Sequence, residues 1–287
     1  MTSAPADANT SNANASDVPP AAPSPVVAPS LADLADLALA LELADLADAI
    51  TLPAYVSRGF TVRLKDDRSE VTEADRGTEH ALRARLTEAR ADHAVLGEEE
   101  GLIGAADARC RWIIDPIDGT SNFVKGLPIW ATLIALERDG QLVVGVASAP
   151  ALGRRWWAVR GGGAHVNGET IGVSAVAALS DAHIAYSDIG SFAKHGLADE
   201  LVVLTGQAWR ARGIGDFWMH MLVAEGAFDA AVEPIVSLWD LAAVQIIVEE
   251  AGGVFTNLRG EAKPDGGSAI SSNGHLHGVM LDAFARP

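Results

Sequence analysis

Two aspartates, Asp115 and Asp118, stand three residues apart near the middle of the chain. They follow the apolar run Trp112–Ile114, which is typical of a short buried strand. We expect Pro116 to end this strand and the turn behind it to aim both carboxylates at one point. Such oxygen ligands suit Mg²⁺, so the spacing suggests a metal site. Taken alone, the pairs Asp-Pro and Asp-Gly also occur in ordinary turns.

The next residues offer a place for a phosphate group. Gly119 lets the backbone approach a ligand closely, and Thr120 and Ser121 can begin a helix. The first N–H groups of a helix have no partner within the helix and lie at its positive end, so they hold anions. Because Mg²⁺ usually binds carboxylates together with substrate phosphate oxygens, the segment predicts a phosphate ester beside a metal ion.

Two further segments place acids at the expected ends of other elements. Glu98 and Glu99 follow a short apolar run and a glycine, so they are expected where a strand opens into a loop. Ser237 is a candidate N-cap for a helix over residues 238–250, which puts Asp240 in its first turn. The alternatives are a solvated acidic surface and a carboxylate that only complements the helix dipole.

Taken together, the three acidic segments resemble a known family. GEE at 97–99, DPIDGTSNF at 115–123 and WDLAA at 239–243 are similar, in kind and order, to motifs of the Mg²⁺-dependent, lithium-sensitive inositol-monophosphatase superfamily. The resemblance spans roughly residues 31–287. It implies an α/β fold of the layered α+β kind, an αβαβα sandwich with two closely packed halves.

One subgroup of that superfamily fits the chain better than the inositol enzymes. Residues 126–136, 150–157 and 215–217 are similar to the actinobacterial histidinol-phosphate phosphatases, although Ser121 stands where that subgroup often has a lysine. The resemblance implies hydrolysis of L-histidinol phosphate to L-histidinol and phosphate, a step of histidine biosynthesis. Alternatives are inositol 1-phosphate or another small sugar or nucleotide phosphate. A different class, a non-catalytic regulator, is disfavoured by the intact acids.

The resemblance implies two to three Mg²⁺ ions per subunit. One ion would be held by Glu98, Asp115 and the backbone carbonyl of Ile117, and a second by Asp115, Asp118 and Asp240. A weaker third ion would use Glu98 and water. Without a cation, acids placed so close together would raise one another's pKa.

The resemblance also assigns catalytic groups. Thr120, oriented by a hydrogen bond to Asp75, would position or deprotonate a metal-bound water whose pKa the metal lowers, and Glu98 is expected to act with them. The backbone N–H groups of Gly119, Thr120 and Ser121 would hold the phosphoryl oxygens. We expect direct in-line attack by water with no covalent phospho-enzyme.

Three residues of the second half are expected to meet the rest of the substrate. Arg212 and Glu233 match substrate-binding positions of the superfamily, and Asp216 precedes an apolar helix. Histidinol phosphate carries an ammonium group and an imidazole, so acids near the leaving group are physically sensible. Asp240 is expected to line the same pocket. The alternative for Asp216 is an ion pair with Arg212.

The surrounding elements follow from periodicity and capping residues. Ser30 is expected to cap a helix with apolar stripes over residues 31–50, and Thr72 a helix over 76–90 whose first turn holds Asp75. Lys65 and Asp66 match a loop that closes on the site in the family. We also expect strands at 130–136, 142–147, 154–160, 183–187, 209–212 and 228–232, helices at 197–205 and 217–225, and His275 and His277 at the surface or in caps.

Composition bounds the remaining possibilities. With 21 Lys and Arg against 38 Asp and Glu, the net charge is −17, which disfavours nucleic acid and anionic membrane surfaces as partners. No uninterrupted apolar run reaches the length of a membrane span, and no signal peptide is expected. One cysteine, Cys110, allows no intrachain disulfide, which suits a cytoplasmic protein.

The domain organisation is expected to be simple. Residues 1–29 are mostly Ala, Pro, Ser, Asn and Asp, which predicts a disordered tail or a start-site artefact. Residues 30–287 are expected to form a single phosphatase domain. Its first half, 30–160, would carry most metal-binding acids, and its second half, 161–287, the substrate residues and the last metal ligand. The resemblance implies a homodimer that acts on a small-molecule phosphate ester.

Overall fold

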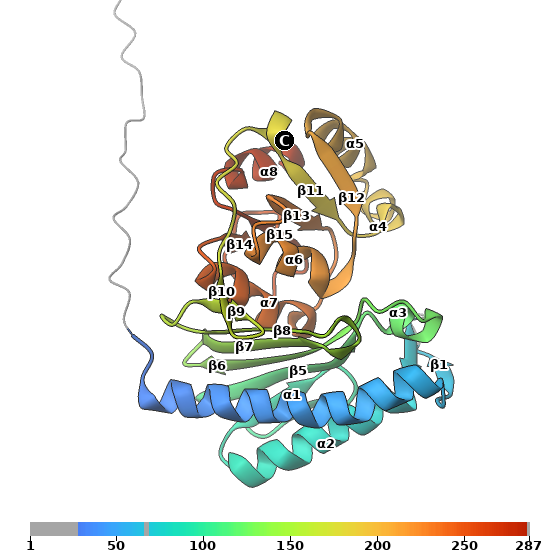
Figure 1. Ribbon diagram of the computed structural model, residues 1–287, viewed down its shortest axis with the longest axis vertical. Helices are drawn as coiled ribbons and strands as arrows, with labels where there is room; N and C mark the ends of the chain where they lie inside the picture. The colour runs from blue at the N-terminus through green and yellow to red at the C-terminus, as the bar shows by residue number, and fades with distance from the viewer. Residues whose placement is uncertain (1–27, 66–68, 286–287) are drawn as a thin grey trace, which may run out of the picture.

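The computed structural model describes residues 28–65 and 69–285 (Figure 1). Its helices are α1 (Leu31–Ser57), α2 (Glu73–Ala89), α3 (Thr120–Lys125), α4 (Ile189–Lys194), α5 (Ala198–Gln207), α6 (Asp216–Ala224), α7 (Leu238–Glu250) and α8 (His277–Phe284). Nearly all of the predicted tail, and Asp66 of the predicted closing loop, lie outside the described residues.

In the part of the chain that the structure describes, the strands form two large sheets and one short pair. In spatial order the first sheet is β10 (Glu169–Ile171), β9 (Ala164–Val166), β8 (Arg154–Val159), β7 (Gln141–Ala149), β6 (Ala131–Arg138), β5 (Cys110–Asp118), β3 (Ala94–Gly97) and β4 (Gly101–Ile103). The second is β12 (Arg210–Gly213), β11 (His183–Tyr186), β13 (Ala230–Glu233), β15 (Ala269–Ser272) and β14 (Val254–Thr256). The short pair is β1 (Val62–Leu64) with β2 (Glu70–Thr72).

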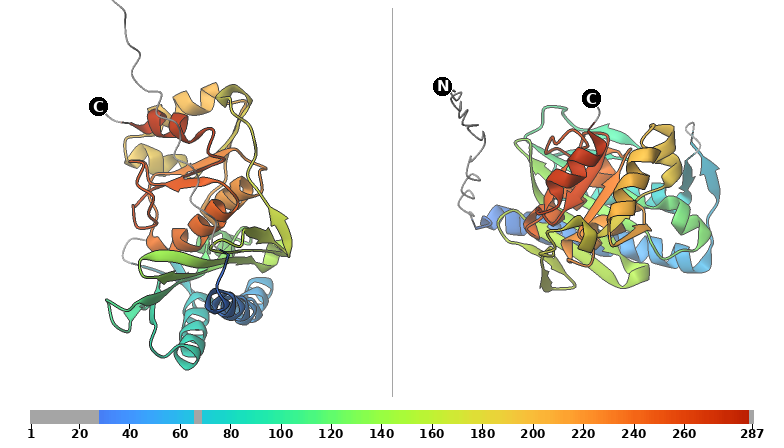
Figure 2. Two further views of the ribbon diagram at one scale, coloured as in Figure 1. Left: turned by 90° about the vertical axis from the view of Figure 1, so that its left-hand side faces the viewer. Right: turned by 90° about the horizontal axis from the view of Figure 1, so that it is seen from above.

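Helices and sheets alternate as layers, which confirms the predicted αβαβα sandwich. From bottom to top, Figure 1 shows α1 and α2, the first sheet, α6 and α7, the second sheet, and α4, α5 and α8. The left view of Figure 2 shows α1 and α2 side by side beneath the first sheet. Among the described helices, none is both long and apolar enough to cross a membrane.

Helices cover both faces of the first sheet, and the apolar sequence of its strands reflects this burial. Along β6, Ile134 and Leu136 join the apolar cluster formed with α1 and α2, while Leu133 and Ala135 join the cluster formed with α7. Successive side chains of a strand point to opposite faces. A strand buried on both faces therefore reads as a continuous apolar run, as the predicted strand at 130–136 does.

The prediction that Pro116 ends its strand is wrong. Strand β5 continues to Asp118, and its pairing with β6 shifts between Asp115 and Asp118. Such a bulge leaves a residue outside the regular ladder, which is where a strand tolerates proline. The carbonyl of Pro116 accepts a hydrogen bond from Thr132 Oγ1 at 2.8 Å. The bulge thus keeps both aspartates on the strand instead of beyond it.

Capping residues fixed several helix starts as predicted. Ser237 and Asp240 form a capping box at the start of α7, whose bounds match the prediction, and Thr72 and Asp75 form one at the start of α2. Helices α4 and α8 and strands β14 and β15 were not predicted. His277 is buried and contacts Thr256 Oγ1 and Ser272 Oγ, both at 2.9 Å, so its surface assignment is wrong; His275 is exposed.

The two expected halves share elements across their boundary. Strands β9 and β10 continue the first sheet past residue 160, and α7, from the second half, packs on that sheet. The same helix also packs on α6, which covers the second sheet. The layer made by α6 and α7 is therefore the place where residues from both sheets meet.

Candidate active site

The predicted acids gather where β3, β5 and α7 come together. Strands β3 and β5 run parallel, with Gly97 opposite Ile114. Because parallel strands end at the same edge of a sheet, Glu98 and Asp115, the residues that follow, lie at that edge. Helix α7 packs across β5, β6 and β7 and contributes Asp240 from its first turn.

Three of these acids form a compact group. Carboxylate oxygens of Asp115, Asp118 and Asp240 all lie within 4.8 Å of one another. A backbone N–H holds each carboxylate: that of Ile117 on Asp115 Oδ1 at 2.9 Å, of Phe217 on Asp118 Oδ2 at 2.7 Å, and of Ser237 on Asp240 Oδ2 at 2.8 Å. The group is therefore fixed by the backbone of β5, of the start of α6 and of the N-cap of α7.

Burial makes this group costly to ionise. Burial away from water raises the pKa of Asp115 and of Asp118 well above the ordinary aspartate value, and the charges of neighbouring carboxylates raise both pKa values further. Burial raises the pKa of Asp240 to about 7. An all-oxygen donor set of this kind fits a hard divalent cation such as Mg²⁺, whose charge would reverse the repulsion.

Thr120 lies next to this group and is oriented by Asp75. Its Oγ1 is 3.1 Å from Asp75 Oδ1 and 2.9 Å from the carbonyl oxygen of Ile117. The other oxygen of Asp75 accepts the N–H and the hydroxyl of Thr72 at 2.9 and 2.6 Å. The expected hydrogen bond between Thr120 and Asp75 is therefore present. Burial raises the pKa of Asp75.

Glu98 lies beside the three aspartates but has a different partner. Lys65 Nζ is 2.7 Å from Glu98 Oε1 and 2.6 Å from Glu99 Oε1. Glu98 is close enough for its charge to raise the pKa of Asp115. Behind this turn, the buried Glu79 accepts the N–H groups of Glu99 and Glu100 at 2.8 and 2.9 Å. The turn that carries Glu98 thus rests on a fixed buried acid.

Gly119 permits a close approach between the two halves. It has φ +80°, and a Cβ there would lie 2.9 Å from the carbonyl oxygen of Ile129 and 3.3 Å from Asp216 Oδ2. Asp216 itself has φ +59°, a strained conformation for a residue other than glycine. Its Oδ2 accepts a hydrogen bond from Asn122 Nδ2 at 2.7 Å, and burial raises its pKa to about 6.

The alternative assignment of Asp216 to an ion pair with Arg212 is wrong. Arg212 is exposed, and its Nη1 donates to the carbonyl of Ala211 at 2.9 Å. Ser121, at the start of α3, is exposed as well. Of the residues expected to bind substrate, Gly119, Thr120, Asp216 and Asp240 thus lie at the carboxylate group, and Glu233 lies in the cavity beside it.

A cavity of about 200 Å³ opens beside the aspartates. Asp118 and Asp240 line one part of it, and Asp216 and Glu233 supply two further acids. Burial raises the pKa of Glu233 well above the ordinary glutamate value, and the charges of Asp216 and Asp240 raise it further. The cavity therefore joins the carboxylate group to an acidic pocket that contains Glu233, one of the residues expected to meet the substrate.

The pocket also holds a residue that the sequence did not reveal, His220 of α6. It stands in the apolar stretch Trp218–Met221, where a lone histidine is usually a core residue. Its Nδ1 lies 2.8 Å from Ser271 Oγ, and the side chain is 1% exposed. No spacing or motif in the sequence distinguishes this histidine from the others.

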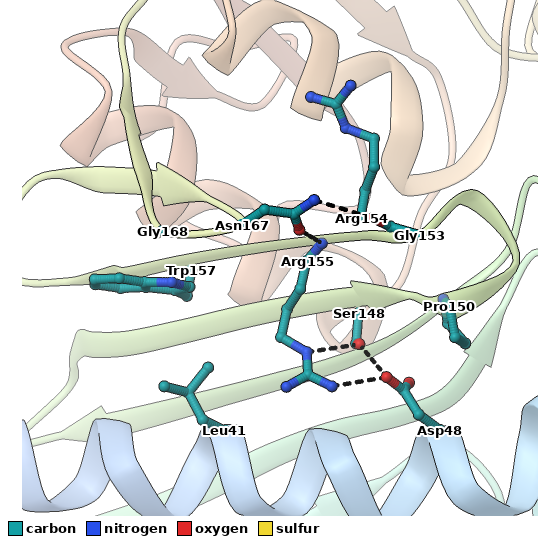
Figure 3. A pocket seen from close by; sticks show the side chains of 10 residues that line it. All are labelled: Leu41, Asp48, Ser148, Pro150, Gly153, Arg154, Arg155, Trp157, Asn167 and Gly168. Carbon is teal, nitrogen blue, oxygen red and sulfur yellow. Dashed lines mark hydrogen bonds and ion pairs between the residues drawn. The ribbon is translucent and has the colours of Figure 1, made fainter.

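A larger hollow, of about 410 Å³, lies between α1 and strand β8 (Figure 3). Arg155 points from β8 toward α1, where it meets Asp48 at 2.7 Å and Ser148 Oγ at 2.9 Å. It also pairs with Asp45 at 2.7 Å. Because the acids of this hollow have Arg155 as a cationic partner, it has the character of a structural contact between helix and sheet, unlike the acidic pocket.

Comparison with known proteins finds one family model, related phosphatases and solved structures of the same fold. The model of the inositol monophosphatase family matches residues 35–286. The histidinol-phosphatase of Streptomyces coelicolor is 48% identical over 86% of this chain and 96% of its own length, and that of Mycobacterium tuberculosis is 49% identical with the same coverage. The solved structure of the extragenic suppressor protein suhB from Bartonella henselae is similar with a TM-score of 0.82 at 30% identity, covering 88% of this chain and 99% of that one.

Proposed function

The chain belongs to the inositol monophosphatase family and is a phosphatase, and we propose that it is a Mg²⁺-dependent enzyme that hydrolyses L-histidinol phosphate to L-histidinol and phosphate. The observation that carries the proposal is the acidic pocket beside three clustered aspartates, of which Asp115 and Asp118 are buried and Asp240 is half-buried. Two relatives with nearly half of their residues identical are named histidinol-phosphatases, which favours this ester over inositol 1-phosphate.

We assign the metal ligands as the family membership implies. Glu98, Asp115 and the carbonyl of Ile117 would hold one ion, and Asp115, Asp118 and Asp240 another, with a weaker third ion at Glu98. When bound, Mg²⁺ supplies a water of lowered pKa and neutralises negative charge on the phosphoryl group. Glu98 would exchange its contact with Lys65 for the ion. The proposed attack is in line, without a covalent intermediate.

The chain's own groups would orient the reactants. The Oγ1 of Thr120 can take a proton from an attacking water as its own hydroxyl proton passes to Asp75 Oδ1, and the second oxygen of Asp75 is fixed by Thr72. The N–H groups of Gly119, Thr120 and Ser121 are proposed to hold the phosphoryl oxygens. All of these groups come from the segment after β5 or from the start of α2.

The leaving alcohol would occupy the acidic pocket. Asp216 and Glu233 offer carboxylates to the ammonium group of histidinol, and charge-assisted hydrogen bonds of this kind are the strong ones. Arg212 is proposed as a further substrate contact, since its exposed guanidinium makes no ion pair with a described residue. Family membership further leads us to propose a cytoplasmic homodimer of single-domain subunits (residues 30–287) that Li⁺ inhibits by displacing Mg²⁺.

The test is phosphate release from two esters by the purified protein, with Mg²⁺ and with excess EDTA. We expect a higher kcat/KM for L-histidinol phosphate than for inositol 1-phosphate, and reversible loss of both activities in EDTA. A preference for inositol 1-phosphate would overturn the proposed substrate but not the family. Undiminished activity in EDTA would overturn the metal assignment.

A further inference from the structure

The pocket contains one polar atom that the proposed reaction has not yet used. His220 lines the cavity with Asp216, Glu233 and Asp240. Its Nε2 is buried and has no hydrogen-bond partner among the described residues. Buried polar groups are nearly always hydrogen-bonded. An orphaned ring nitrogen on a residue that lines the cavity beside the aspartates therefore indicates a group that receives its partner from the ligand.

The surroundings of His220 fix its orientation. Nδ1 lies 2.8 Å from Ser271 Oγ on β15, and the ring packs on Phe255 of β14 with centroids 5.6 Å apart. If Nδ1 carries the hydrogen and donates to Ser271, Nε2 is an acceptor. Burial lowers the pKa of His220 to about 3, so the ring is neutral at physiological pH and its free nitrogen keeps its lone pair.

The nearest charged group to this nitrogen is the carboxylate of Glu233. Its Oε2 lies 3.8 Å from His220 Nε2, which is too far for a direct hydrogen bond. Two acceptors at this separation suit a donor group that lies between them and gives each of them one hydrogen. A protonated amine has three such hydrogens, whereas each hydroxyl of a sugar or inositol ring has one.

We propose that His220 is a specificity-determining residue whose Nε2, together with the carboxylate of Glu233, receives the protonated amine of the alcohol that leaves the phosphate. This inference rests on the proposed function, since it deepens the choice of substrate at the same site. The amine of histidinol is on the carbon next to the ester CH₂, so it lies close to the phosphoryl group. The cavity likewise runs from Asp118 and Asp240 to His220 and Glu233.

The experiment compares wild type with His220→Leu, which has similar bulk and no ring nitrogen, and His220→Gln, which keeps an acceptor. For each protein, kcat/KM is measured for L-histidinol phosphate and for inositol 1-phosphate. We expect the ratio of the two values to fall about tenfold in His220→Leu, which corresponds to loss of one hydrogen bond to a charged group. The change should lie mainly in KM, and His220→Gln should recover much of the ratio.

Two further readouts separate recognition from folding. Calorimetric titration with L-histidinol, in Mg²⁺ and inorganic phosphate, should show weaker binding to His220→Leu. Ser271→Ala removes the partner of Nδ1 without touching the pocket acids, and should lower the same ratio by a smaller factor. A long-range ¹H–¹⁵N spectrum of wild type should show Nε2 without a hydrogen.

The outcomes distinguish this inference from the proposed function. An equal fall for both esters in folded His220→Leu, an unchanged ratio, or a protonated Nε2 would overturn the role of His220 alone. Absence of histidinol phosphate hydrolysis in wild type would overturn the proposed substrate itself.

Discussion

Glu79 and Asp115 are both buried acids near the site, but their surroundings differ in charge. Glu79 of α2 is fully buried, but Arg83 lies 2.7 Å from it, and it accepts two backbone N–H groups. Asp115 is equally buried, yet its charged neighbours Glu98, Asp118 and Asp240 are acids. The negative charge of Glu79 is therefore balanced by a cation of the chain, whereas that of Asp115 is not balanced by any described residue. We call these the balanced and the unbalanced group.

This difference separates structural acids from functional ones. A buried carboxylate is stable when a cation and hydrogen bonds balance it, as they do at Glu79. Within residues 28–65 and 69–285, the backbone supplies Asp115 with only the N–H of Ile117, and burial and repulsion raise the pKa of this carboxylate. A bound cation would supply the missing positive charge, and three carboxylates within 4.8 Å of one another suit a single divalent ion.

The largest effect is expected from removing the acid of the balanced group, Glu79. Glu79→Ala leaves Arg83 buried without its partner and frees the N–H groups of Glu99 and Glu100, so the free energy of unfolding should fall by about 3–5 kcal/mol. Urea denaturation measures it. Glu42→Ala, which removes the exposed partner of Arg85, should change the free energy of unfolding little. Equal losses in the two variants would contradict the contrast.

The next largest effect is expected from a substitution in the unbalanced group, at Asp115. Asp115→Asn removes a ligand and a repelling charge, so turnover at saturating substrate should fall by at least about a hundredfold, the upper range found for residues that support metal ligands. Stability in EDTA should not fall, because the lost carboxylate had no cation. Phosphate release and thermal melting measure these two quantities. Near-wild-type turnover, or a clear loss of stability in EDTA, would argue against the metal assignment.

The pH dependence of stability sharpens the same comparison. Burial raises the folded-state pKa of Asp216 to about 6 and of Asp240 to about 7, against about 3.9 in an unfolded chain. Between these values the folded state binds more protons, so without metal the free energy of unfolding should decrease as pH rises from about 4 to about 7.

Saturating Mg²⁺ favours the ionised form and should reduce this slope while raising stability at neutral pH. Denaturation midpoints at several pH values, in EDTA and in Mg²⁺, provide the measurement. Parallel curves under the two conditions would mean that the acids do not hold the ion.

The smallest expected effect concerns the acidic pocket. Glu233→Gln keeps shape and an acceptor but loses charge, so kcat/KM for L-histidinol phosphate should fall roughly tenfold, and that for inositol 1-phosphate far less. Asp216→Asn should act in the same direction. If neither substitution alters the ratio between the two esters, the groups that select the substrate lie elsewhere.

The sequence predicted those elements best whose ends are set by neighbouring residues. Helix α7 was predicted with its observed bounds because Ser237 and Asp240 form a capping box and glycines follow its end. The convergence of Asp115, Asp118 and Asp240 followed from motifs recognised by resemblance. Periodicity alone would not have joined residues that lie more than a hundred positions apart.

Tertiary contacts decided what the sequence did not show. The bulge in β5 depends on its pairing with β6, so Pro116 was assigned to a strand end. His220 and His277 owe their roles to hydroxyl partners on β15, Ser271 and Ser272. The family resemblance placed the loop of Lys65 near the site, but no motif pairs Lys65 with Glu98, so this contact was not predicted.

The most direct test of the central claim is calorimetric titration of Mg²⁺ into the metal-free protein. Wild type should bind the ion, and Asp115→Asn should bind it at least about tenfold more weakly. Asp48→Asn, which changes a half-buried acid that Arg155 already balances, should bind Mg²⁺ as wild type does. Equal affinity in wild type and Asp115→Asn would contradict the claim that the unbalanced aspartates form the metal site.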